Sequence, residues 1–148
     1  MKIVASIFGI GYIRKGGGTV AAAFAVLVWW LLFHNYGTEF AIQGLLIILV
    51  TVLGIWAGNK VEVAWGKDSY RVVIDEVAGM FITLLFIPID WKWLLTGFVL
   101  FRFFDIAKPL YIRRMEALKG GWGVMLDDVL AGIYANVVLQ VIVLIAKW

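Results

Sequence analysis

Three long stretches of this chain contain no Lys, Arg, Asp or Glu, and they constrain its fold more than any other feature. They cover residues 16–38, 40–59 and 129–146, which are 23, 20 and 18 positions. A helix needs about 20 apolar residues to cross the roughly 30 Å hydrocarbon core of a bilayer. The whole chain is 64% hydrophobic and 16% charged, against about 45–50% and about 25% in soluble domains. These patterns predict an integral membrane protein.

Two further segments are apolar but shorter, and each reaches a full span only by including charged neighbours. They are residues 77–89, preceded by Asp75-Glu76, and residues 93–101, followed by Arg102 and Asp105. We therefore expect an all-α, polytopic membrane protein that forms a single domain over residues 1–148. Its five transmembrane helices are predicted at about 19–36, 40–58, 72–88, 91–107 and 126–146. The short apolar start of the chain, before Arg14-Lys15, is expected to be an interfacial segment.

The distribution of Lys and Arg predicts the orientation of these helices. From the N-terminal stretch through successive connections to the C-terminus, the counts are 3, 0, 3, 1, 4 and 1. Cytoplasmic loops carry an excess of basic residues. The alternation therefore predicts a cytoplasmic N-terminus and a C-terminus on the far side of a multi-pass protein.

Acidic residues gather at three predicted helix ends that share the cytoplasmic side in this orientation. They are Asp75, Glu76, Asp105, Asp127 and Asp128. Acids at a helix N-terminus are also favoured by the helix dipole alone. The dipole would then have to account for acids at three separate helix ends on the same side of the membrane. Carboxylates collected at reduced dielectric repel one another, and a cation relieves the repulsion. We expect Mg²⁺, which takes oxygen ligands and typically combines one or two carboxylates with substrate phosphate.

Basic residues near these acids indicate a phosphate ligand. Arg102, Asp105 and Lys108 are spaced three apart and can share one helical face, and Arg113 follows on the same side. The stretch from Lys15 to Thr19 places glycines at a predicted helix N-terminus, a natural anion site, with Thr19 as candidate N-cap. Two simpler interpretations remain open, namely a structural Arg102–Asp105 ion pair and a glycine turn.

Composition excludes several classes of function. The chain has no Cys, which removes disulfides, thiolate metal sites and cysteine nucleophiles. It has one His, His34, which removes multi-histidine metal sites. The net charge of +3 is small and dispersed, so we expect no nucleic-acid partner.

Three blocks in the second half resemble the bacterial phosphatidylglycerophosphatase A family. Residues 75–84 (DEVAGMFITL) are similar to its D-E-x-x-G-M-x-I-T-L block. Residues 90–109 are similar to its D-W…G-F…F-R-x-x-D-x-x-K-P block, and residues 120–132 to its G-G-x-G-[IV]-M-x-D-D-x-x-A-G block. The chain departs from the family at 13–19, where only the final Gly-Thr of S-P-x-x-P-G-T is present, and at Tyr111, where a proline is expected.

The resemblance implies a Mg²⁺-dependent phosphatase of the bacterial inner membrane, with its active site facing the cytoplasm. It would hydrolyse phosphatidylglycerol phosphate to phosphatidylglycerol and inorganic phosphate in phospholipid biosynthesis. The five acids would hold the metal and position the nucleophile. Arg102 and Lys108 would bind phosphate oxygens, with Arg113 contributing less; a role for Lys15 depends on the local pattern alone. Membrane lipids are the expected surroundings, and a homo-oligomer is left open.

A small cation-binding or transport subunit is the alternative from another class. An ion path would distribute carboxylates in depth across the bilayer, whereas here they cluster toward one face. A purely structural membrane subunit leaves the cluster without a purpose. The D-G-x-x-A-R…G-x-x-x-D-x-x-x-D pattern of the CDP-alcohol phosphotransferases is absent.

Overall fold

The computed structural model describes residues 1–35, 39–67 and 69–147, and every regular element within them is helical. In chain order these elements are α1 (Lys2–Ala5), the 3₁₀ turn η1 (Ile10–Tyr12), α2 (Gly17–Phe33), α3 (Phe40–Trp65), α4 (Ile74–Leu84), α5 (Trp91–Ala107), α6 (Ile112–Met115) and α7 (Gly121–Ala146). The predicted all-α class is confirmed.

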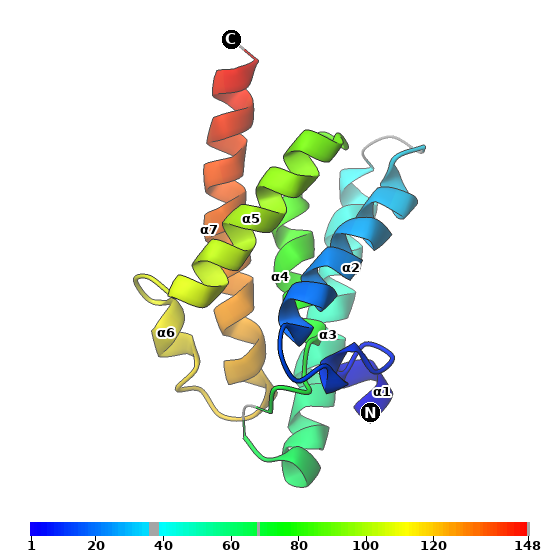
Figure 1. The fold of residues 1–148 in the computed structure, drawn as a ribbon, viewed down its shortest axis with the longest axis vertical. Helices are drawn as coiled ribbons and strands as arrows, with labels where there is room; N and C mark the ends of the chain where they lie inside the picture. Colours follow the sequence, from blue (N-terminus) through cyan, green and yellow to red (C-terminus); the bar gives the residue numbers. More distant parts are fainter. Residues whose placement is uncertain (36–38, 68, 148) are drawn as a thin grey trace.

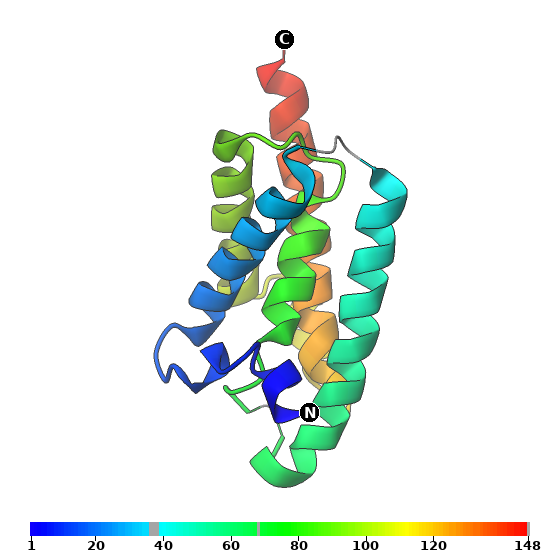
Figure 2. The ribbon, with the colours of Figure 1, turned by 90° about the vertical axis from the view of Figure 1, so that its right-hand side faces the viewer.

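Helix α4 is the central element of the bundle. It contacts α2, α3, α5 and α7, which surround it (Figures 1 and 2). Ala78, Met80 and Leu84 have no exposed surface, and eight of the eleven α4 residues are buried. Beyond the two acids of its first turn α4 is largely apolar, and a helix that is apolar on every side is favoured in such an enclosed position. The acidic start of α4 therefore lies among the surrounding helices, at the end of the bundle where α4 begins.

The crossing of α4 and α7 depends on small residues. A Cβ on Gly132 would collide with the backbone oxygen of Gly79, and a Cβ on Gly79 would lie 2.6 Å from the backbone oxygen of Asp128. Thr83 Oγ1 donates a hydrogen bond of 2.9 Å to the Gly79 oxygen. Small residues let helix backbones approach closely, which brings the acids of α4 and α7 together.

Helix α4 is shorter than predicted, because it begins two residues later and ends four residues earlier than the range 72–88. Pro88 disfavours the helical conformation for the residue before it. The side-chain amide of Asn136, on α7, donates to the backbone oxygens of Thr83 and Leu85 at 2.9 and 2.8 Å. These bonds satisfy carbonyl groups that the end of the helix leaves free.

The other predicted boundaries are met to different degrees. Helix α5 has the predicted range. Helix α2 begins two residues before the predicted 19 and ends at Phe33, and the predicted end at 36 lies outside the described residues. Helix α3 continues seven residues past 58, and α7 begins five residues before 126. The length of a stretch without charged residues predicts which part of a helix lies in hydrocarbon. The helix itself can continue through polar residues, until its backbone hydrogen bonding ends.

Two helices, α3 and α7, are long and apolar enough to cross a membrane by length and composition, and α2 is a shorter apolar helix. The N-terminal segment, with α1 and η1, packs against the end of α3 (Figure 1). The Val73 amide donates to the Ala5 oxygen at 2.9 Å, and the Tyr12 and Trp65 rings meet edge to face at 5.9 Å. This segment therefore covers the bundle end at which α4 begins.

Candidate active site

A polar cavity of about 330 Å³ lies at the end of the bundle where α2 and α4 begin and where α5 ends. Side chains from α4, α5 and α7 contribute carboxylates to its wall, and these are Asp75, Glu76, Asp105, Asp127 and Asp128. Arg102 and Lys108 line the same cavity. The structure thus brings together all five acids and two of the bases that the sequence analysis selected.

Three of the acids form a compact cluster. Asp75, Glu76 and Asp128 each offer a carboxylate oxygen, and these oxygens lie within 4.8 Å of one another. Asp75 Oδ1 and Glu76 Oε2 are buried and have no hydrogen-bond partner among the described residues. Asp128 is only 3% exposed. Buried carboxylate oxygens that lack donors and converge on one point fit a hard divalent cation, so this cluster can hold a metal ion.

Local structure explains why these acids converge. Asp75 and Glu76 occupy the first turn of α4, where the helix dipole favours negative charge. Asp127 and Asp128 lie on α7 just before the close crossing with α4, with Asp128 packed beside Gly79. The backbones of α4 and α7 approach closely at this crossing, so the two acidic pairs meet.

Two basic residues of the cavity, Arg102 and Lys108, are paired with acids. Arg102 forms an ion pair with Asp105 one turn along α5. Lys108 donates to Asp127 at 2.7 Å and also pairs with Glu116. Burial lowers the pKa of Lys108, but its hydrogen bonds to Asp127 and Glu116 outweigh that effect and raise the pKa above its usual value. Lys108 is therefore a permanent positive charge beside the acids.

The start of α2 forms the facing part of the wall. Gly16, Gly17 and Gly18 line the cavity. Gly16 has φ +85° and precedes a helix with no side-chain cap. A Cβ on Gly18 would collide with Glu76 Oε1. Glycine at this position lets the N-terminus of α2, which attracts anions, approach the acidic cluster.

Three predicted substrate-binding residues lie outside the cavity wall. Lys15, Thr19 and Arg113 are exposed and do not line it. The prediction that Thr19 caps the helix is wrong, because α2 begins earlier, at Gly17. A helix N-cap must precede the first helical residue, whereas Thr19 lies within the first turn. The substrate-binding role predicted for these three residues stays a prediction.

Sequence reasoning missed three polar residues in the wall, namely Arg14, Ser69 and Tyr70. The Arg71 and Arg14 guanidinium groups lower the pKa of the Tyr70 phenol through side-chain hydrogen bonds. Arg14 forms no ion pair among the described residues, unlike Arg102 and Lys108. Its position just before the glycines at the start of α2 is the signal in the sequence that could have indicated its place in the wall. The loop residues Ser69 and Tyr70 carry no sequence pattern that indicates this position.

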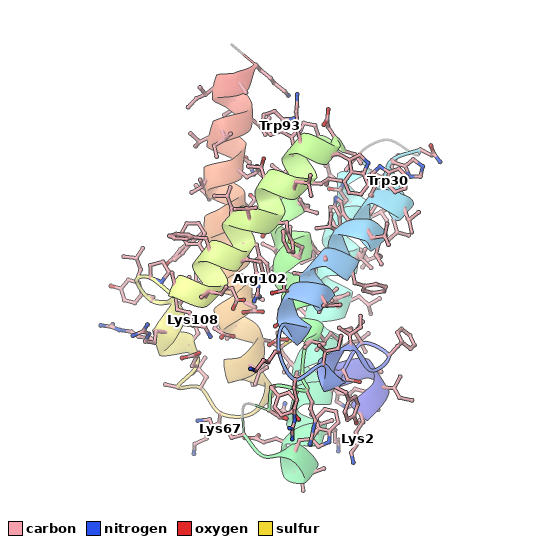
Figure 3. All side chains as sticks on the ribbon, viewed as in Figure 1. Lys2, Trp30, Lys67, Trp93, Arg102 and Lys108 are labelled. Carbon is pink, nitrogen blue, oxygen red and sulfur yellow. The ribbon has the colours of Figure 1, made fainter. Side chains whose placement is uncertain are left out.

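The two ends of the bundle differ in chemistry (Figure 3). Arg102 lies near mid-height in the view and Lys108 somewhat below it, while Lys2 and Lys67 lie toward the lower end and Trp30 and Trp93 toward the upper one. At the upper end the Trp30 ring packs against Trp91 at 5.4 Å. Lys2 and Lys67 therefore mark the cavity end of the bundle, and Trp30 and Trp93 mark the opposite end.

Comparisons with known proteins show the family of this chain. The sequence model of the family described as Phosphatidylglycerophosphatase A matches residues 3–143. A Haemophilus influenzae protein named Phosphatidylglycerophosphatase A is 38% identical, covering 94% of this chain and 86% of that protein. The Escherichia coli protein of the same name is 33% identical, covering 91% and 78%. A Bacteroides thetaiotaomicron protein, provisionally named a phosphatidylinositol-3-phosphatase, is 42% identical, covering 99% and 92%. No solved structure matches the chain.

The family and the fold together define a helical-bundle phosphatase, with a polar cavity in which carboxylates that can hold a metal ion lie beside Arg102 and Lys108. The chain belongs to the phosphatidylglycerophosphatase A family.

Proposed function

We propose that this protein is a Mg²⁺-dependent phosphatase that converts phosphatidylglycerol phosphate to phosphatidylglycerol and inorganic phosphate. The observation that carries the proposal is the convergence of five carboxylates with Arg102 and Lys108 in one cavity. Membership of the family and the names of the Haemophilus and Escherichia relatives support this substrate. Mg²⁺ is proposed because an all-oxygen donor set next to a phosphate ester is the setting in which this ion is most often bound.

The acids divide into two roles in this proposal. Asp75, Glu76 and Asp128 would hold the ion, which would neutralise charge on the phosphate oxygens. Asp127 has one oxygen that accepts from Lys108 and a second, buried oxygen with no partner among the described residues. That second oxygen is available to orient a water molecule and to accept its proton.

Hydrolysis requires one bond to form and one to break. The water oxygen bonds to phosphorus, the bond between phosphorus and the glycerol oxygen breaks, and a proton is delivered to the glycerol oxygen. Arg102 and Lys108 would bind the phosphate oxygens and stabilise the charge that spreads over them in the transition state. The N–H groups at the start of α2 would contribute from the facing wall.

We place the protein in the bacterial inner membrane as one multi-pass domain, with the cavity at the cytoplasmic face. Two apolar helices of 26 residues support a membrane location. The alternating counts of basic residues along the chain support the orientation. In this arrangement a lipid phosphate would reach the cavity from the headgroup layer.

The test is phosphate release from phosphatidylglycerol phosphate in detergent–lipid micelles, with Mg²⁺ and then with excess chelator. We expect release that requires the ion and returns when Mg²⁺ is restored. Folded protein that releases no phosphate under either condition would refute the proposal.

A second candidate substrate is phosphatidylinositol 3-phosphate, which the name of the 42% identical Bacteroides protein favours. Both lipids carry a phosphomonoester on a headgroup that a phosphodiester joins to diacylglycerol. The assay is therefore run on both lipids at the same mole fraction in micelles. The larger kcat/KM identifies the preferred substrate, and we expect that to be phosphatidylglycerol phosphate.

A further inference from the structure

A second cavity, of about 200 Å³, lies between α2 and α5. Its lining is apolar or aromatic throughout and consists of Ala23, Val26, Leu27, Trp91, Leu95 and Phe98. None of these residues belongs to the polar cavity. Leu27 and Leu95 are 45% and 55% exposed, so the cleft opens at the outer surface of the bundle. We call it the α2–α5 cleft.

One continuous face of α5 joins the two cavities. Trp91, Leu95, Phe98, Arg102 and Asp105 follow one another at spacings of four, three, four and three residues. Residues three or four apart lie on the same side of a helix. The first three line the α2–α5 cleft, and the last two line the polar cavity. A single face of α5 therefore changes from apolar to charged along its length.

Helix α2 repeats this arrangement on the other side. Gly16 lines the polar cavity, and Ala23 and Leu27, seven and eleven residues further on, line the cleft. Seven residues are close to two helical turns, so these positions share a face. Figures 1 and 2 both show α2 and α5 as neighbours, and Figure 2 shows the central α4 between them and α3.

The dimensions suit a lipid. From Arg102 to Phe98 the rise along α5 is about 6 Å, and from Gly18 to Ala23 along α2 it is about 7.5 Å. The cleft then extends about 10 Å further along α5, from Phe98 to Trp91. At its far end the Trp30 and Trp91 rings close the space between the helices, with centroids 5.4 Å apart.

We propose that the α2–α5 cleft binds an acyl chain of the phospholipid whose phosphate occupies the polar cavity. The inference rests on the proposed function, since it assigns the apolar part of the same substrate. When the phosphorylated headgroup lies beside Arg102 and Asp105, the glycerol that carries the acyl chains lies over the part of α2 and α5 between the polar cavity and the cleft. From there the acyl chain lies against a surface that lacks polar groups, so its binding leaves no polar atom unpaired.

The first test fills the cleft with the substitution Ala23→Phe and compares it with Ala41→Phe. Ala41 is exposed on α3 and belongs to neither cavity. KM and kcat are measured for dioleoyl and dihexanoyl phosphatidylglycerol phosphate at equal mole fraction in the same micelles. We expect Ala23→Phe to raise KM for the dioleoyl lipid by about 10-fold or more, with dihexanoyl KM and both kcat values unchanged. Ala41→Phe should alter none of them. An unchanged dioleoyl KM in Ala23→Phe, or an equal rise for both lipids, would overturn the proposal.

The second test separates this inference from the proposed function. A phosphatidylglycerol phosphate analogue with a photoreactive diazirine in one acyl chain is crosslinked to the unaltered protein, and the sites are mapped by mass spectrometry. We expect labels on the α2–α5 cleft that unlabelled phosphatidylglycerol phosphate displaces, whereas the same chain on phosphatidylcholine labels the exposed faces without preference. Identical labelling by both lipids would refute the cleft even in an active enzyme. Absence of phosphate release together with headgroup-dependent labelling would refute the enzymatic proposal and leave the cleft supported.

Discussion

Lys108 donates a hydrogen bond of 2.7 Å to Asp127, and this contact joins the residue that ends α5 to the second turn of α7. Lys108 has the left-handed conformation, with φ +46°, which turns the chain at the end of α5. It also pairs with Glu116, beyond α6. One ammonium group thus connects three segments and neutralises part of an acidic cluster, while its charge remains next to the place proposed for phosphate.

Loss of a single clustered acid should abolish most of the activity. Asp128→Asn keeps the size of the side chain but removes a charge from the group with Asp75 and Glu76. Removing one preorganised electrostatic group from a catalytic site typically costs about 100-fold or more in kcat, and we expect a loss of at least that size in phosphate release. The control is Asp90→Asn, which keeps the hydrogen bond that caps α5 at the opposite end and should retain full activity. Asp128→Asn with unaltered turnover would contradict the site assignment.

The same variant should have the opposite effect on stability when no divalent ion is present. Asp75, Glu76 and Asp128 repel one another in a buried setting, so removing one charge should raise the thermal midpoint in chelator. Mg²⁺ should stabilise the unaltered protein, by about 2.7 kcal/mol when the free ion is at 100 times its dissociation constant. Thermal unfolding in detergent measures both effects. A Mg²⁺ shift as large in Asp128→Asn as in the unaltered protein would locate the ion elsewhere.

Replacing Lys108 should weaken substrate binding and leave two acids, Asp127 and Glu116, without their ion-pair partner. Lys108→Met keeps an unbranched side chain but removes its ammonium group and with it the hydrogen bonds to Asp127 and Glu116. A hydrogen bond to a charged group contributes about 1.5–3 kcal/mol, so we expect kcat/KM to fall about 10- to 100-fold. Lys119→Met, in the exposed connection before α7, is the matched control and should leave kcat/KM within 2-fold or so of the unaltered value. Equal losses in the two variants would indicate a general charge effect rather than a specific contact.

The α4–α7 crossing should tolerate no added methyl group. Gly132→Ala places a Cβ against the Gly79 oxygen, and overpacking of this kind costs about 1–3 kcal/mol. We expect a lower thermal midpoint and reduced activity, because the crossing brings Asp75 and Asp128 together. Gly44→Ala on α3 meets nothing within 4 Å, and it should be neutral or stabilise the protein by up to about 1 kcal/mol. Equal stability of the two variants would show that the crossing is more adaptable than its geometry indicates.

The orientation in the membrane can be tested directly because the chain has no Cys. Lys119→Cys lies just before α7 and Lys147→Cys just after it. We expect a membrane-impermeant maleimide to label Lys147→Cys in intact spheroplasts and Lys119→Cys only in inverted vesicles. The parent chain provides the background, since it has no thiol to label. Labelling of both positions from one side would refute a spanning α7.

The helical class and the set of acids were predictable from the sequence, for two physical reasons. Long charge-free stretches leave few alternatives to helices in an apolar surrounding. Inserting a charged residue into the membrane costs free energy, and such residues in transmembrane segments usually have a function. The acids at the ends of the predicted helices could therefore be selected without knowledge of the fold, namely Asp75, Glu76, Asp105, Asp127 and Asp128. The range of α5 was predicted correctly because Asp90 caps one end and Lys108-Pro109 follows the other.

Other features depended on contacts between segments distant in the chain. The early end of α4 is stabilised by Asn136, about fifty residues later. Tyr70 and Arg14 reach the cavity because the loop before α4 and the N-terminal segment fold over the same end of the bundle. The division of the α5 face between the cavity and the cleft appears only with α2 beside it. Hydropathy and charge are properties of single residues and decide which segments become helices, whereas the site consists of distances between helices, and those were decided by side-chain packing at contacts such as Gly79 against Gly132.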